Sequence, residues 1–161
     1  MPYLDIDNLD HDVALATALG NMVVAWARAE TTIVKAYALV TNVHYNLAAA
    51  AYYNIPTFES RTKALLAMIE DREEPFLERE ALRDAVSALV KLAKTRNTWV
   101  HGLWIFDQKP AVTRVFNMKH PSATRRATPV TANAVQQHVN AVRQRAKELE
   151  ALSPVKIALR A

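Results

Sequence analysis

The chain has 161 residues, of which 51% are apolar and 22% are charged, as is usual for one globular domain. It has two glycines and no cysteine, which excludes a glycine-rich phosphate-binding loop, disulfides and sites built on thiolates. No apolar run approaches the roughly 18 residues of a membrane-spanning helix, and the acidic first residues lack the pattern of a secretory signal, so we expect a soluble cytoplasmic protein without a membrane partner.

The first long helix is predicted over residues 9–43, where apolar residues recur at spacings of three and four. Asp10 or Asp12 is the expected N-cap or first-turn anion. Gly20 lies inside the helix and costs about 1 kcal/mol relative to alanine, so it either marks the close approach of another helix or is simply tolerated. The apolar positions are Val13, Leu15, Ala16, Leu19, Met22, Val23, Trp26, Ile33, Tyr37 and Val40.

Three further helices are predicted in the middle of the chain. A short one covers residues 46–53 and is ended by Pro56, because a residue before proline avoids helical angles. Thr57 is the expected N-cap of the next, over residues 58–71. The third runs over residues 75–101 from a proline in its first turn, and the glycine that follows it is expected to end it as a C′ residue.

The pattern then changes to that of a hairpin. Residues 103–106 and 112–116 are aromatic and β-branched, which is typical of two short strands. Residues 117–131 are polar, basic and interrupted by proline, so we expect a loop. Thr131 is the expected N-cap of a last helix over residues 132–151. The residues of this helix that we expect to face inward are Ala134, Val135, Val139, Val142, Ala146 and Leu149.

These elements predict an all-α fold, a helical bundle with one short β-hairpin inserted before the last helix. Residues 1–161 are expected to form a single domain, with residues 152–161 as a C-terminal tail.

Positive charge is concentrated near the end of the chain. Residues 109–161 hold ten Lys and Arg against two Asp and Glu, whereas residues 1–108 hold ten against fourteen. Such an imbalance indicates a polyanionic partner, most simply nucleic acid, or else a solvated basic face. The densest basic patch comprises Lys119, Arg125 and Arg126 beside His120, which could hold an RNA backbone, bind an acidic antitoxin or contact nothing.

One segment carries residues suited to chemistry, KTRNTWVHGLW over residues 94–104. Asn97 and His101 are four residues apart and therefore lie on one face of a helix, and the long side chain of Arg96 can fold toward that face. Arginine offers a fixed fork of donors to a phosphate, and histidine can take or give a proton near neutral pH. These groups suffice for RNA cleavage in which the 2′-oxygen attacks the neighbouring phosphate.

The pattern Arg96-Asn97-x-x-x-His101 resembles the RNxxxH form of the motif of HEPN domains. These domains are small helical bundles, many of them metal-independent ribonucleases of toxin–antitoxin and phage-defence systems. The resemblance extends to the long first helix with its acidic Glu30, the helical middle and the position of the motif at the end of a later helix. The hairpin and basic loop after the motif depart from the family.

The resemblance implies that Arg96 and His101 are catalytic and that Asn97 supports them. It also implies a homodimer in which two motifs face one cleft, an RNA substrate, an antitoxin protein as a candidate partner, and no cofactor. The remaining histidines lack the spacing of metal ligands, so we expect no metal site.

A second interpretation stays open, in which the chain is a noncatalytic HEPN-like module for dimerisation or for binding nucleotide or RNA. Arg96 would then pair with an acidic residue such as Glu30 or Glu70. His101 would cap its own helix, and Asn97 would tie the helix end to the following loop.

Overall fold

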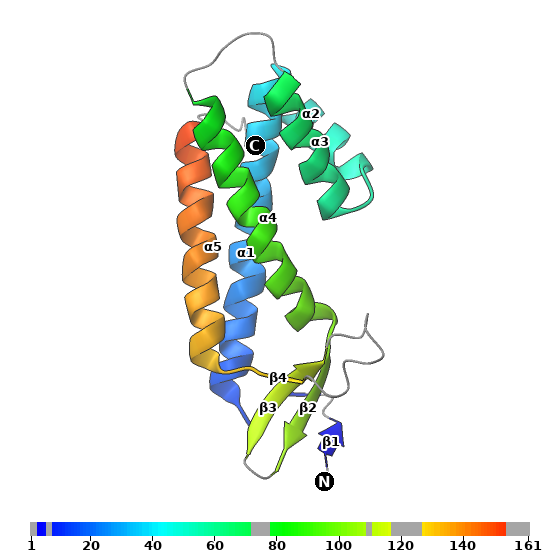
Figure 1. The fold of residues 1–161 in the computed structure, drawn as a ribbon, viewed down its shortest axis with the longest axis vertical. Helices are drawn as coiled ribbons and strands as arrows, with labels where there is room; N and C mark the ends of the chain where they lie inside the picture. The colour runs from blue at the N-terminus through cyan, green and yellow to red at the C-terminus, as the bar shows by residue number, and fades with distance from the viewer. Residues whose placement is uncertain (1–2, 6–7, 72–77, 109–110, 117–126, 154–161) are drawn as a thin grey trace, which may run out of the picture. The chain divides into compact units, whose positions relative to one another are not determined.

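The computed structural model describes residues 3–5, 8–71, 78–108, 111–116 and 127–153. For residues 3–5 only the backbone is described. Within these ranges the fold is mainly helical, as predicted (Figure 1). The helices are α1 (Val13–Thr41), α2 (Tyr45–Asn54), α3 (Phe58–Asp71), α4 (Arg79–His101) and α5 (Ala132–Leu152), and the strands are β1 (Tyr3–Asp5), β2 (Leu103–Asp107), β3 (Val112–Phe116) and β4 (Thr128–Pro129). Among the helices so described, none is long and apolar enough to cross a membrane.

Side-chain caps start three of these helices at residues that the sequence names as candidates, although α1 begins at Val13 and not at the predicted residue 9. Asp12 Oδ1 accepts a hydrogen bond from the backbone N–H of Leu15 at 2.9 Å at the start of α1. Thr57 and Thr131 begin α3 and α5 in the same way, each accepting from the N–H three residues later, at 3.1 and 3.2 Å. The cap of α2 was not predicted: it is His44, whose Nδ1 accepts from the N–H of Asn46 at 3.3 Å.

The predicted hairpin exists but belongs to a larger sheet. Strands β2 and β3 pair antiparallel, with Ile105 opposite Arg114. The sheet order is β1-β2-β3-β4, so two unpredicted strands flank the hairpin. The expectation of a loop over residues 117–131 was wrong for residues 128–129, which form β4, and residues 117–126 lie outside the described ranges.

The chain forms two compact units, and α1, α4 and α5 contribute to both. The first unit comprises Met1–Ala25 and Leu92–Ala141, and the second comprises Trp26–Lys91 and Val142–Ala161. The expectation of a single domain stays a prediction.

The second unit is a helical core closed by aromatic and ionic contacts. Trp26 of α1 meets the ring of Phe58 of α3 edge-on, with centroids 5.3 Å apart. Lys35 Nζ of α1 lies 2.6 Å from Glu150 Oε1 of α5, which joins these two helices. The fully buried large side chains of this unit are Tyr52, Ile33, Val34, Leu65, Ile69, Leu82, Val86, Leu89 and Leu149.

The first unit packs the remaining parts of α1, α4 and α5 with the sheet. Its core includes Leu15, Met22, Ile105, Val115, Val135 and Val139. Three apolar residues of the α1 pattern are instead exposed: Ala16, and Val13 and Val23, which are 70% and 54% exposed. Ala134, expected to face inward, is exposed, so that prediction was wrong. A spacing of three and four places residues near one helix face but does not say how wide the covered part of that face is.

Gly102 ends α4 at His101, as predicted, but for another reason. No described glycine has a positive φ, so Gly102 is not a left-handed C′ residue. A Cβ on Gly102 would instead lie 2.3 Å from Val115 Cγ2 and 2.5 Å from the carbonyl oxygen of Thr98. Glycine is therefore required by the close approach of β3 to the end of α4.

Candidate functional site

The three predicted catalytic residues all lie in the last two turns of α4, within the first unit. The helix is amphipathic here, since Ala93 is buried while Lys94, Asn97 and His101 are exposed. His101 is the last helical residue, because the chain turns at Gly102 into β2. The motif therefore occupies the solvent-facing end of a helix that is fixed by the strand following it.

The structure brings two of the three side chains into contact. Arg96 Nη1 donates a hydrogen bond to Asn97 Oδ1 at 3.0 Å. Arg96 is half-buried, whereas Asn97 and His101 are exposed. His101 lies one helical turn beyond Asn97 on the same side of α4, since four residues make slightly more than one turn. The arrangement offers a guanidinium, an amide and an imidazole along one helix end.

Two tryptophans secure the end of α4. Trp104 Nε1, on β2, donates to the carbonyl oxygen of Trp99 at 2.9 Å, which satisfies one of the acceptors that a helix C-terminus leaves open. The ring of Trp99 meets that of His138 on α5 edge-on, with centroids 5.0 Å apart. Trp104 is thereby tied to the end of α4, and Trp99 is packed against α5.

His138 is the residue near the motif that sequence reasoning missed. Its side chain is buried, and its Nε2 has no hydrogen-bond partner among the described residues. Burial lowers the pKa of His138, because desolvation disfavours the charged imidazole. The signal was present in the sequence: His138 falls within the inward spacing Val135, Val139 and Val142 of α5.

The carboxylates considered as partners of Arg96 each have an arginine of their own within the second unit. Glu30 Oε1 lies 3.7 Å from Arg61 Nη1, and Glu70 Oε1 lies 3.5 Å from Arg83 Nη1. Arg61 also donates to the carbonyl oxygen of Ile55 at 2.7 Å. Glu30, which the resemblance singles out, thus takes part in joining α1 to α3.

The basic patch of Lys119, Arg125 and Arg126 lies outside the described residues, as does His120, so it stays a prediction. In the described part of the chain, no three His, Asp or Glu side chains gather as they would around a metal ion.

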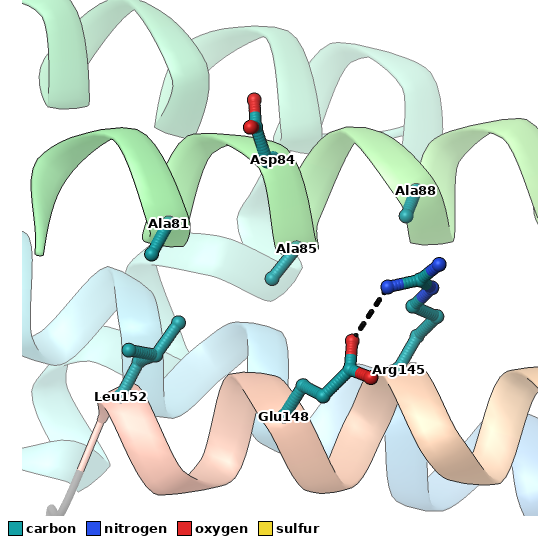
Figure 2. A pocket seen from close by; sticks show the side chains of 7 residues that line it. All are labelled: Ala81, Asp84, Ala85, Ala88, Arg145, Glu148 and Leu152. Carbon is teal, nitrogen blue, oxygen red and sulfur yellow. Dashed lines mark hydrogen bonds and ion pairs between the residues drawn. The ribbon is translucent and has the colours of Figure 1, made fainter.

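An open groove of about 390 Å³ lies between α4 and α5 of the second unit (Figure 2). Ala81, Ala85 and Ala88 face it from α4, and Leu152 and the ion pair of Arg145 with Glu148, 2.7 Å long, face it from α5. Asp84 points away from α5. None of the motif residues lines this groove. Arg145 and Glu148 neutralise each other in their ion pair, so the groove offers no group suited to the chemistry of the motif.

Comparisons with protein-family models, with curated protein sequences and with solved structures find no match to the chain.

Proposed function

We propose that the chain is a metal-independent endoribonuclease of the HEPN type that acts as a homodimer. The observation that carries the proposal is the end of α4, where the guanidinium of Arg96 is held 3.0 Å from Asn97 Oδ1 and the imidazole of His101 is exposed on the last turn. An arginine held by a neighbouring amide is oriented before RNA arrives, so less side-chain freedom is lost on binding a phosphate.

The chemistry needs only these groups and the RNA itself. The imidazole of one copy takes the proton of a 2′-hydroxyl, and the 2′-oxygen attacks the adjacent phosphorus. The bond from phosphorus to the 5′-oxygen breaks, and the protonated imidazole of a second copy gives its proton to that leaving oxygen. Arg96 balances the charge that develops on the phosphate oxygens. The products are a 2′,3′-cyclic phosphate and a 5′-hydroxyl.

The charge distribution supports an RNA substrate, since residues 109–161 are strongly basic and begin shortly after the motif. Within this proposal the protein is a toxin or phage-defence effector in the cytoplasm, where cellular RNA is the target. A partner with acidic character, such as an antitoxin, would neutralise the same basic segment. The residues proposed to hold the RNA backbone are Lys119, Arg125 and Arg126.

The test is cleavage of total RNA by the purified protein in the presence of EDTA. Wild type should cleave and leave 2′,3′-cyclic phosphate ends, and both Arg96→Ala and His101→Ala should abolish cleavage. The matched controls are Arg143→Ala, an exposed arginine of α5, and His44→Asn, which keeps a side chain able to cap α2; both should cleave as wild type does. EDTA-sensitive cleavage, or cleavage that survives in His101→Ala, would contradict the proposal.

One observation favours the second candidate, a noncatalytic module that binds RNA or nucleotide. Arg96 is half-buried and already engaged by Asn97, as an arginine with a structural role would be. Fluorescence anisotropy with labelled RNA separates the two candidates. A module would bind RNA without cleaving it, and Arg96→Ala would then lower the unfolding midpoint well below that of wild type. In either case Arg125→Ala with Arg126→Ala should weaken binding and flatten its dependence on salt.

A further inference from the structure

His138 of α5 is buried in surroundings that suit only its neutral form. The residue is 8% exposed, and its Nε2 is shut off from water and has no hydrogen-bond partner among the described residues. A neutral imidazole can carry its one proton on Nδ1 and leave Nε2 as a bare acceptor. Protonation adds an N–H at Nε2, where no described group accepts it, and a buried donor without an acceptor is unfavourable.

The helices of the first unit give a charged His138 no carboxylate to pair with. No charged residue occurs from Val13 to Ala25 of α1, and none besides His138 can gain a charge from Ala132 to Ala141 of α5. The titratable residues of α4 in this unit are all basic: Lys94, Arg96 and His101. These residues would repel an imidazolium rather than stabilise it.

The carboxylates of this unit precede α1 or lie on the sheet. Asp12 caps α1 through the N–H of Leu15, and Asp107 Oδ2 on β2 lies 3.8 Å from Arg114 Nε of β3. The second histidine near the sheet, His11, is exposed, and its Nε2 lies 3.2 Å from Thr113 Oγ1. The other carboxylates of the unit all belong to the first ten residues: Asp5, Asp7 and Asp10.

His138 contacts the residue that anchors the end of α4. The ring of Trp99 meets the imidazole edge-on, with centroids 5.0 Å apart. None of residues 94–101 is buried, and Trp99 is the largest of the half-buried side chains among them. The same part of α5 is held more firmly, because Val135 and Val139 on either side of His138 are fully buried. A disturbance at this contact should therefore displace the end of α4 rather than α5.

We propose that His138 is a positioning residue for His101: its neutral ring holds Trp99 and the last two turns of α4 in place, and its protonation releases them. Trp99 lies between Asn97 and His101, so release of its ring lets the turn that carries both residues fray. Burial lowers the pKa of His138, so the release occurs below the pH at which a free histidine gains its proton. The effect on α4 is independent of RNA, whereas the effect on cleavage rests on the proposed function.

Hydrogen exchange of the full-length protein, expressed as protection relative to an unstructured chain, tests the release without RNA. From pH 7.5 to pH 5.0 the protection of residues 98–101 in wild type should fall by about tenfold or more, while that of α3 changes little. His138→Phe keeps a ring against Trp99 but cannot be charged, so its protection should not depend on pH in this range. His138→Ala lacks the ring, so residues 98–101 should be weakly protected at both pH values.

Two control variants show whether another histidine causes the fall in protection. His44→Asn removes an exposed histidine of the second unit, and His101→Ala removes the exposed histidine at the end of α4 itself. Both should keep the wild-type fall. A fall that disappears in His101→Ala and persists in His138→Phe would assign the titration to His101 and overturn the proposal.

The pH profile of RNA cleavage in EDTA is the second readout. Relative to its rate at pH 7.5, His138→Phe should retain about threefold more activity at pH 5.0 than wild type does. A wild type that cleaves no RNA at any pH contradicts the proposed function alone, because hydrogen exchange still reports on His138. Equal protection of residues 98–101 at both pH values in wild type, or cleavage profiles of wild type and His138→Phe that coincide, would overturn the proposal. If His138→Phe does not fold, His138→Leu replaces it with the same expected results.

Discussion

Replacing Gly102 by alanine would put a methyl carbon into space that β3 already occupies. The new Cβ would lie 2.3 Å from Val115 Cγ2, 2.5 Å from the carbonyl oxygen of Thr98 and 2.7 Å from that of Phe116. All three distances are well inside van der Waals contact. The valine methyl can move by rotation of its side chain, but the two carbonyl oxygens move only with the backbone of α4 and β3.

The expected cost follows from these contacts. Overpacking costs about 1–3 kcal/mol, and the upper end applies because two of the neighbours are backbone atoms. Since the φ of Gly102 is not positive, alanine can adopt its conformation. Alanine also reduces the conformational entropy of the unfolded chain, which offsets about 0.4–1 kcal/mol of this destabilisation. Gly102→Ala should therefore lower the free energy of unfolding by about 2 kcal/mol or more, which is a fall in Tm of roughly 4–8 °C for a chain of this size.

Urea unfolding followed by circular dichroism at 222 nm measures this change in dilute protein. Gly20→Ala is the matched control, because it makes the same substitution where nothing lies within 4 Å among the described residues, and it should stabilise by about 0.8–1 kcal/mol. In a Val115→Ala background Gly102→Ala should still destabilise, since the contacts with both carbonyls remain. A Gly102→Ala variant within about 0.5 kcal/mol of wild type would refute the reasoning.

Three further outcomes are expected, each measured by urea unfolding. Burial lowers the pKa of His138, so below about pH 6.5 the unfolded chain takes up a proton that the folded chain does not. The free energy of unfolding should therefore fall as the pH drops through about 6.5. In His138→Leu the free energy of unfolding should depend less steeply on pH in this range. Arg61→Ala removes the ion pair with Glu30, the hydrogen bond to the carbonyl of Ile55 and the contacts with two tyrosine rings. It should lower the free energy of unfolding by about 2 kcal/mol. Arg61→Lys should not recover this stability, because an ammonium lacks the planar fork of donors. Thr57→Ala removes the cap of α3 and should cost about 1 kcal/mol, while Thr57→Ser should cost little.

The caps of α1, α3 and α5 could be predicted because their causes are local. A cap at Asp12, Thr57 or Thr131 acts on an N–H only three residues away, so a short window of sequence contains both partners. The start of α3 at Phe58 was predicted for the same reason. The hairpin strands were recognisable from their β-branched and aromatic residues, and the motif residues from their spacing along one helix.

The edges of the sheet could not be predicted, because their pairing joins distant parts of the chain. Leu4 of β1 pairs with Phe106 of β2, and Val115 of β3 pairs with Thr128 of the two-residue strand β4. Strands this short carry no pattern of their own, since three residues cannot show an alternation. Their existence depends on a neighbouring strand that offers free backbone groups.

The sequence by itself determined which segments form helices, where α3 and α5 begin, and that Arg96, Asn97 and His101 share the end of one helix. The tertiary structure decided what surrounds them. It made Gly102 a point of close approach rather than a left-handed cap, brought His138 against Trp99, and left Val13 and Val24 uncovered on α1. Local patterns report the hydrogen bonds and capping of a few neighbouring residues, whereas burial and close contact depend on which distant surface each face meets.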